Sequence, residues 1–86
     1  MEFHVAGVLA RTRPGEADAV TARIGAVPGA QVHASAEGKL VVTLEASDAP
    51  ALTALLARIP LIAGVLSAVL VYQHHEPLED RHDGPP

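Results

Sequence analysis

Residues 38–45, with the sequence GKLVVTLE, constrain the fold more than any other stretch, because a turn-forming glycine opens directly into β-branched residues and leucine. Alternate residues of a strand share a face. One face would be wholly apolar and the other would carry the polar groups: Leu40, Val42 and Leu44 against Val41, Thr43 and Glu45. Gly38 suits the positive φ of a tight turn, so residues 31–35 should return as a hairpin partner across residues 36–38. We predict that residues 38–45 form the central strand.

Length and composition exclude several classes of protein. A chain of 86 residues can build one domain with one modest core. The absence of cysteine excludes a disulfide framework and thiolate metal sites. Phe3 and Tyr72 are the aromatic residues, and the formal net charge is −4, so the chain lacks both the stacking groups and the positive charge that nucleic-acid binding requires.

The two ends of the chain differ in composition. Acidic residues gather near the C-terminus, at Glu76, Glu79, Asp80 and Asp83, in a segment that ends in Gly-Pro-Pro. We expect residues 1–76 to form a single domain and residues 77–86 to be a disordered acidic tail that folding does not need. The N-terminus has no basic region before its apolar run, unlike a secretory signal. Residues 59–75 are uncharged, but Pro60 and Gly64 interrupt them and they are too short to span a membrane. We expect a soluble, cytoplasmic protein without membrane insertion.

The apolar periodicity indicates two strands and two helices around the central strand. Residues 3–10 are almost wholly apolar and predict a buried strand. Pro14 suits the first turn of a helix that ends at residues 27–29, and a second helix is capped by Ser47 or Asp48. Residues 65–72 predict the last strand, bounded by Gln73 and two histidines. The helices have apolar faces made of Ala17, Val20, Ile24 and Val27 in the first, and of Leu52, Leu55, Leu56 and Ile59 in the second.

This order, strand, helix, strand, strand, helix, strand, predicts a ferredoxin-like βαββαβ fold, an α/β sandwich of the α+β type. Right-handed crossovers would place the first and third strands in the middle of a four-stranded antiparallel sheet, with residues 30–35 at an edge and both helices on one face.

The sheet face that two helices leave uncovered should be polar, yet every register predicts an apolar one. The first strand offers either Val5, Gly7 and Leu9 or Ala6, Val8 and Ala10, and the last offers either Val65, Ser67, Val69 and Val71 or Leu66, Ala68, Leu70 and Tyr72. An exposed apolar face of this kind is typical of a peptide, ligand or dimer contact. The alternative is that loops and the tail fold over it.

No group of residues predicts catalysis or metal binding. His74 and His75 are neighbours, and neighbours in a strand point to opposite faces. His33 and Glu45 could face each other on adjacent strands as an acid/base pair, but a cross-strand polar contact explains them as well. We expect a non-enzyme with no catalytic residues, no metal site and no bound cofactor.

Two blocks, GKLVVTLEASD at residues 38–48 and GVLSAVLVYQHHE at residues 64–76, resemble the NapD family closely. The likeness includes the apolar run ending near Pro14 and the VPGAQVH stretch at residues 27–33, so it spans about residues 3–76. The ordered set is more specific than either block, since apolar strands recur in many ferredoxin-like domains. The chain departs from the family pattern at Gly7, where we expect serine, and at Gln73, which precedes two histidines where the family more often has Tyr-His.

This resemblance implies a cytoplasmic chaperone that binds the twin-arginine signal peptide of NapA, the catalytic subunit of the periplasmic nitrate reductase. Binding would delay export until the molybdenum cofactor is loaded into NapA. Such a peptide joins a basic segment to an apolar one, which an apolar face with an acidic rim would complement. The candidate peptide-binding residues are Val5, Leu9, Val41, Thr43 and Glu45, with Glu45 placed to meet an arginine.

Two other functions fit the same pattern. The chain could be a ferredoxin-like module for small-molecule sensing or oligomerisation, although no DNA-binding or catalytic domain accompanies it. It could also be a structural dimer formed through the uncovered face. We expect a monomer or a weak homodimer.

Overall fold

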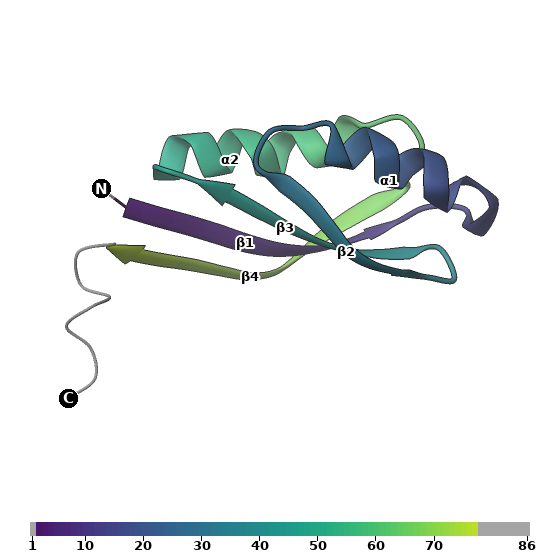
Figure 1. The fold of residues 1–86 in the computed structure, drawn as a ribbon, viewed down its shortest axis with the longest axis horizontal. Helices are drawn as coiled ribbons and strands as arrows, with labels where there is room; N and C mark the ends of the chain where they lie inside the picture. Colours follow the sequence, from purple (N-terminus) through teal and green to yellow (C-terminus); the bar gives the residue numbers. More distant parts are fainter. Residues whose placement is uncertain (1, 78–86) are drawn as a thin grey trace.

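The computed structural model describes residues 2–77, so the predicted tail, apart from Pro77, lies outside the described residues. The element order confirms the βαββαβ prediction (Figure 1). The strands are β1 (Glu2–Arg11), β2 (Ala30–Ala36), β3 (Lys39–Ala46) and β4 (Ser67–Pro77); the α-helices are α1 (Ala17–Gly25) and α2 (Ala49–Arg58); the short 3-10 helices are η1 (Pro14–Glu16) and η2 (Ile59–Leu61).

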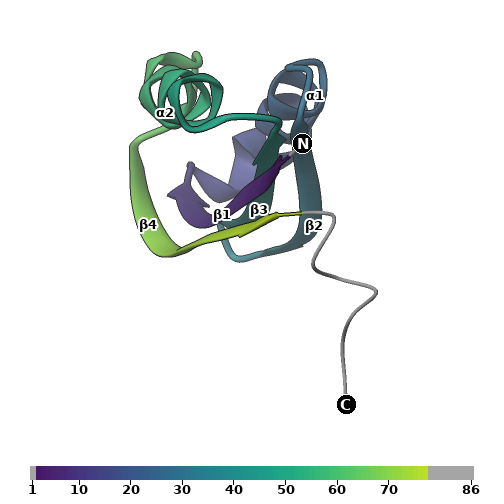
Figure 2. The ribbon, with the colours of Figure 1, turned by 90° about the vertical axis from the view of Figure 1, so that its left-hand side faces the viewer.

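The four strands form one sheet in the order β2-β3-β1-β4, with every neighbouring pair antiparallel. The predicted placement of the first and third strands in the middle is therefore confirmed. Figures 1 and 2 show α1 and α2 side by side on the same face of the sheet. The opposite face carries no helix among the described residues.

The core lies between the sheet and the helices, and it settles which residues of β1 face inward. Ala6, Val8 and Ala10 are buried. Val5 and Leu9, which are only partly buried, therefore lie on the uncovered face. The fully enclosed side chains come from both layers: Val20 and Ile24 of α1, Leu52 of α2, Ile59 of η2, and Leu40, Val42 and Leu44 of β3. The apolar face predicted for residues 40, 42 and 44 is thus the core face.

A tight hairpin joins β2 to β3. Ala36 pairs with Lys39, which leaves Glu37 and Gly38 as a two-residue loop. Both loop residues have positive φ, 54° and 81°, as a type I′ turn requires. The prediction for Gly38 is confirmed, whereas Ala36, expected in the turn, belongs to the strand.

The second helix confirms its predicted cap and corrects part of its predicted core face. Asp48, rather than Ser47, is the cap, because its Oδ1 accepts a hydrogen bond of 2.8 Å from the backbone N–H of Ala51. Leu52 is fully buried, but Leu55 and Leu56 are only half-buried against the core. Leu55 and Leu56 lie at the borders of the helix face that packs on the sheet, while Leu52 lies at its centre.

The last strand differs from its prediction in both bounds and regularity. β4 begins at Ser67 and continues to Pro77, because His74, His75 and the residues after them keep pairing with β1. The pairing register shifts between Gly7 and Val8, so Leu70 lies opposite Val8 while Tyr72 lies opposite Gly7, and Val71 is an extra, bulged residue. Val69 and Tyr72 consequently share the uncovered face, which neither regular alternation predicted.

Candidate functional site

The uncovered face of the sheet, here called the open face, brings together all five residues that the sequence singled out. On the two central strands Val5 pairs with Glu45, Gly7 with Thr43, and Leu9 with Val41. Directly paired residues of an antiparallel sheet project to the same side. Val5, Leu9, Val41, Thr43 and Glu45 are therefore one continuous surface, with Val69 and Tyr72 of β4 beside it. Their part in peptide binding remains a prediction.

The open face exposes large apolar side chains, whereas a sheet face in contact with water is usually polar. Val41 is 47% exposed, Val69 56% and Tyr72 48%. In Figures 1 and 2 no described segment crosses this side of the sheet. A contiguous exposed apolar patch in a small protein is characteristic of a contact surface.

A shallow hollow of about 230 Å³ lies in the middle of the open face. Its lining is almost wholly apolar: Gly7, Val8, Leu9, Val41, Val42, Thr43, Val71 and Tyr72. Val8 and Val42 are buried on the helix side and line the hollow from beneath. Sequence analysis missed Val71 and Tyr72 as lining residues, because only the bulge in β4 brings them there. A lone glycine inside an apolar strand is the one signal that pointed to a close approach at this place.

Polar groups border the hollow toward β2. The Nε2 atom of His33 and the hydroxyl oxygen of Thr43 form a hydrogen bond of 2.6 Å. His33 thus makes a cross-strand polar contact, but with Thr43 and not with Glu45. This arrangement fixes the position of the Thr43 hydroxyl at the edge of the hollow.

His4, His74 and His75 lie near the opposite end of the sheet from the hairpin. His74 pairs with Val5, and His75 pairs with His4, so the two neighbours point to opposite faces as predicted. His4 is buried on the helix side, where its ring stacks on that of His75 with centroids 4.4 Å apart. Among the described residues, no three His, Cys, Asp or Glu side chains are grouped as a metal ion would require.

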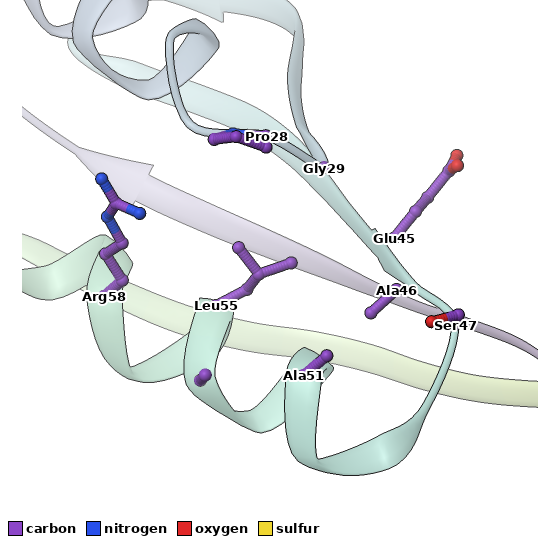
Figure 3. A pocket seen from close by; sticks show the side chains of 9 residues that line it. Pro28, Gly29, Glu45, Ala46, Ser47, Ala51, Leu55 and Arg58 are labelled. Atoms are coloured by element: carbon purple, nitrogen blue, oxygen red, sulfur yellow. The ribbon is translucent and has the colours of Figure 1, made fainter.

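A second hollow, of about 460 Å³, lies on the helix side, between α2 and the turn that precedes β2 (Figure 3). In Figure 3, Leu55 and Ala46 lie between the polar groups of Ser47 and Arg58, which are at the two ends of the hollow. The side chain of Glu45 points away from it. A small-molecule site needs polar groups that converge on one ligand, so this hollow supports the sensing alternative poorly.

The described helices are both too short to cross a membrane.

Residues 3–77 match the model of a protein family described as NapD protein. This chain belongs to the NapD family.

Two individual proteins illustrate how close the NapD relationship is. The chain is 28% identical over 79 residues to the Chaperone NapD of Paracoccus pantotrophus, covering 92% of this chain and 70% of that one. Its fold matches the solution structure of the E. coli Tat proofreading chaperone protein NapD with a TM-score of 0.77 and 26% identity, over 98% of this chain and 88% of that one. The resemblance inferred from the sequence and the predicted fold are both confirmed.

Proposed function

We propose that this chain is a cytoplasmic chaperone that binds the twin-arginine signal peptide of NapA, the catalytic subunit of the periplasmic nitrate reductase. Binding delays export until the molybdenum cofactor is loaded into NapA. The chaperone works by binding alone, and it needs no metal ion or nucleotide of its own. Membership of the NapD family supports the general role, and the open face supports the choice of ligand.

The observation that carries this proposal is the apolar open face with its central hollow. A signal peptide contains an apolar segment that is costly to leave in water, and the open face offers a matching surface. Val41, Val69 and Tyr72 are about half exposed. Covering the remaining exposed part of each side chain would contribute about 1 kcal/mol at the usual value for apolar burial. Apolar contact therefore supplies most of the affinity.

Glu45 provides the polar part of the recognition. It lies on the open face beside Val5, and among the described residues no salt bridge or side-chain hydrogen bond engages its carboxylate. An arginine of the peptide could form two parallel hydrogen bonds with that carboxylate. Exchange of the twin arginines for alanine should weaken binding by about 1 to 3 kcal/mol.

The experiment is a titration with a synthetic NapA signal peptide that contains neither tyrosine nor tryptophan. Tyr72 is the single tyrosine and the chain has no tryptophan, so tyrosine emission reports on the open face alone. We expect saturable binding, a negative heat-capacity change in calorimetry and only modest weakening by salt. No change in emission or heat at hundreds of micromolar peptide would refute the proposal.

Matched variants test whether the open face is the contact. Val41→Thr combined with Val69→Thr keeps side-chain shape and strand propensity but places hydroxyls on the apolar surface. It should weaken binding by about tenfold or more, since each hydroxyl is desolvated without a partner. Leu61→Thr is the control, because Leu61 is 82% exposed in η2 on the helix side. Equal loss of affinity in both variants would contradict the assignment of the face.

Gel filtration separates this proposal from the oligomerisation alternative. A chaperone should elute as a monomer and shift to a one-to-one complex with the peptide. A module that dimerises through the open face should elute as a dimer and ignore the peptide.

A further inference from the structure

The open face carries opposite charges at its two ends. At one end, Glu45 of β3 lies beside Val5 of β1. At the other end, Arg11 of β1 pairs directly with Lys39 of β3, and both are exposed. Ala10 and Leu40, their neighbours on those strands, are buried on the helix side, so strand alternation places Arg11 and Lys39 on the open face.

The two ends lie six residue steps apart along β1, from Val5 to Arg11. At about 3.4 Å per residue the separation is roughly 20 Å. The apolar hollow lies between them, so the face is acidic, then apolar, then basic along β1 and β3. In Figure 1 the basic end is the end of the sheet that holds the β2–β3 hairpin.

The pairing of Arg11 with Lys39 does not stabilise the fold. Like charges directly opposite each other in an antiparallel pair destabilise a sheet. Among the described residues, neither Arg11 nor Lys39 takes part in a salt bridge or side-chain hydrogen bond. Glu37, in the adjoining turn, is two residues from Lys39 and is the acidic residue nearest to either of them in the sequence. Two positive charges at the border of a contact surface can repel the cationic part of a ligand that binds in the wrong orientation.

Resting on the proposed function, we infer that this charge order fixes the direction in which the signal peptide lies on the open face. The twin arginines lie at the Glu45 end, and the apolar segment runs over the hollow toward Arg11 and Lys39. The reverse direction would remove the attraction to Glu45 and place the twin arginines against two like charges. Arg11 and Lys39 are therefore specificity residues that act by repulsion. We expect a preference of about tenfold in affinity for the stated direction. This is the combined effect of gaining one exposed ion pair and avoiding two like-charge contacts.

The test uses two copies of the peptide that carry a nitroxide label, either next to the twin arginines or at the end of the apolar segment. Each is added to ¹⁵N-labelled protein, and the broadening of amide signals is measured. The first label should broaden Val5 and Glu45 most, and the second should broaden Arg11 and Lys39 most. The reversed pattern, or equal broadening by both labels in a peptide that binds, overturns the inference and leaves the proposed function standing. Absence of binding overturns both.

Matched variants show whether the charges cause the preference. Arg11→Gln with Lys39→Gln removes two positive charges from the open face, and the two labels should then give nearly equal broadening while the peptide still binds. Arg23→Gln with Arg58→Gln removes two positive charges from the helix side of the sheet, since Arg23 lies on α1 and Arg58 on α2. This control should keep the direction unchanged. Unchanged direction in the first variant would mean that shape, and not charge, orients the peptide.

Discussion

Tyr72 lies over Gly7: a Cβ atom built on Gly7 would overlap the Cδ2, Cε2 and Cζ atoms of the tyrosine ring. The two residues pair across β1 and β4 just beside the bulge, and both line the hollow of the open face. The glycine that departs from the family pattern therefore has a structural reason in this chain, because a serine side chain at position 7 would meet the ring. Gly7 therefore makes room for the ring of Tyr72, which forms part of the wall of the hollow.

This relationship predicts that the effect of Gly7→Ala changes sign with the residue at position 72. In the native background the new methyl group displaces the ring, and we expect a loss of about 1 kcal/mol in the free energy of unfolding. With Tyr72→Ala already present, the same change should stabilise by about 0.5 to 1 kcal/mol, since alanine is preferred to glycine in a strand. Urea unfolding of the four proteins measures the cycle, and additive effects would show that the residues are not in contact.

The core position of α2 is tested by Leu52→Ala. Leu52 is fully buried, so its truncation should cost about 2 to 5 kcal/mol, a large part of the stability of a domain this small. Leu55→Ala and Leu56→Ala should each cost about half as much, because these side chains are half-buried. The measurement is the unfolding midpoint in urea, with Leu61→Ala as the exposed control. A larger loss for Leu55 or Leu56 than for Leu52 would contradict the observed phase of the helix.

The start of α2 depends on one side chain. Asp48→Ala removes the hydrogen bond to the N–H of Ala51 and should lower the free energy of unfolding by about 0.5 to 2 kcal/mol. Asp48→Asn keeps an acceptor there and should change stability by only a few tenths. Ser47→Ala is the neighbouring control, expected within about 0.5 kcal/mol of the native protein. Equal losses at positions 47 and 48 would argue against the cap.

The hairpin loop contains a residue that is not suited to its conformation. Glu37 has a φ of 54°, in the left-handed region where asparagine and glycine are preferred. Glu37→Asn should therefore stabilise the fold by about 0.5 to 1 kcal/mol and raise the melting temperature by about 2 to 8 °C. Glu37→Gln, which removes the charge but keeps the conformational cost, should give no such gain. If both variants have the same melting temperature, the charge at position 37, and not the backbone conformation, determines the stability of the turn.

The segment that follows β4 is predicted to be unnecessary for folding. Its acidic residues, glycine and prolines provide little apolar surface for a core. A chain that ends at Pro77 should melt within about 2 °C of the full protein. A fall of more than a few degrees would show that residues 78–86 stabilise the domain and would weaken the view that the open face is free for a ligand.

The sequence by itself determined the elements, the topology and the family. Those conclusions rest on local signals: period-two alternation in residues 38–45, the glycine of the hairpin, a cap at Ser47 or Asp48 and the apolar spacing of Val20 and Ile24. Each depends on residues that are close together along the chain, so it can be read without knowing what lies across the sheet.

Only the tertiary structure decided which side of β1 faces the core, how β4 is bulged and which residues meet on the open face. β1 is apolar on both sides, so its alternation carries no information about direction until the pairing with β3 and the packing of the helices select one. Gly7 and Tyr72, and likewise Arg11 and Lys39, are brought together by pairing between segments far apart in the sequence. The five candidate residues form one surface for the same reason: strand register is a property of the assembled sheet and not of any single strand.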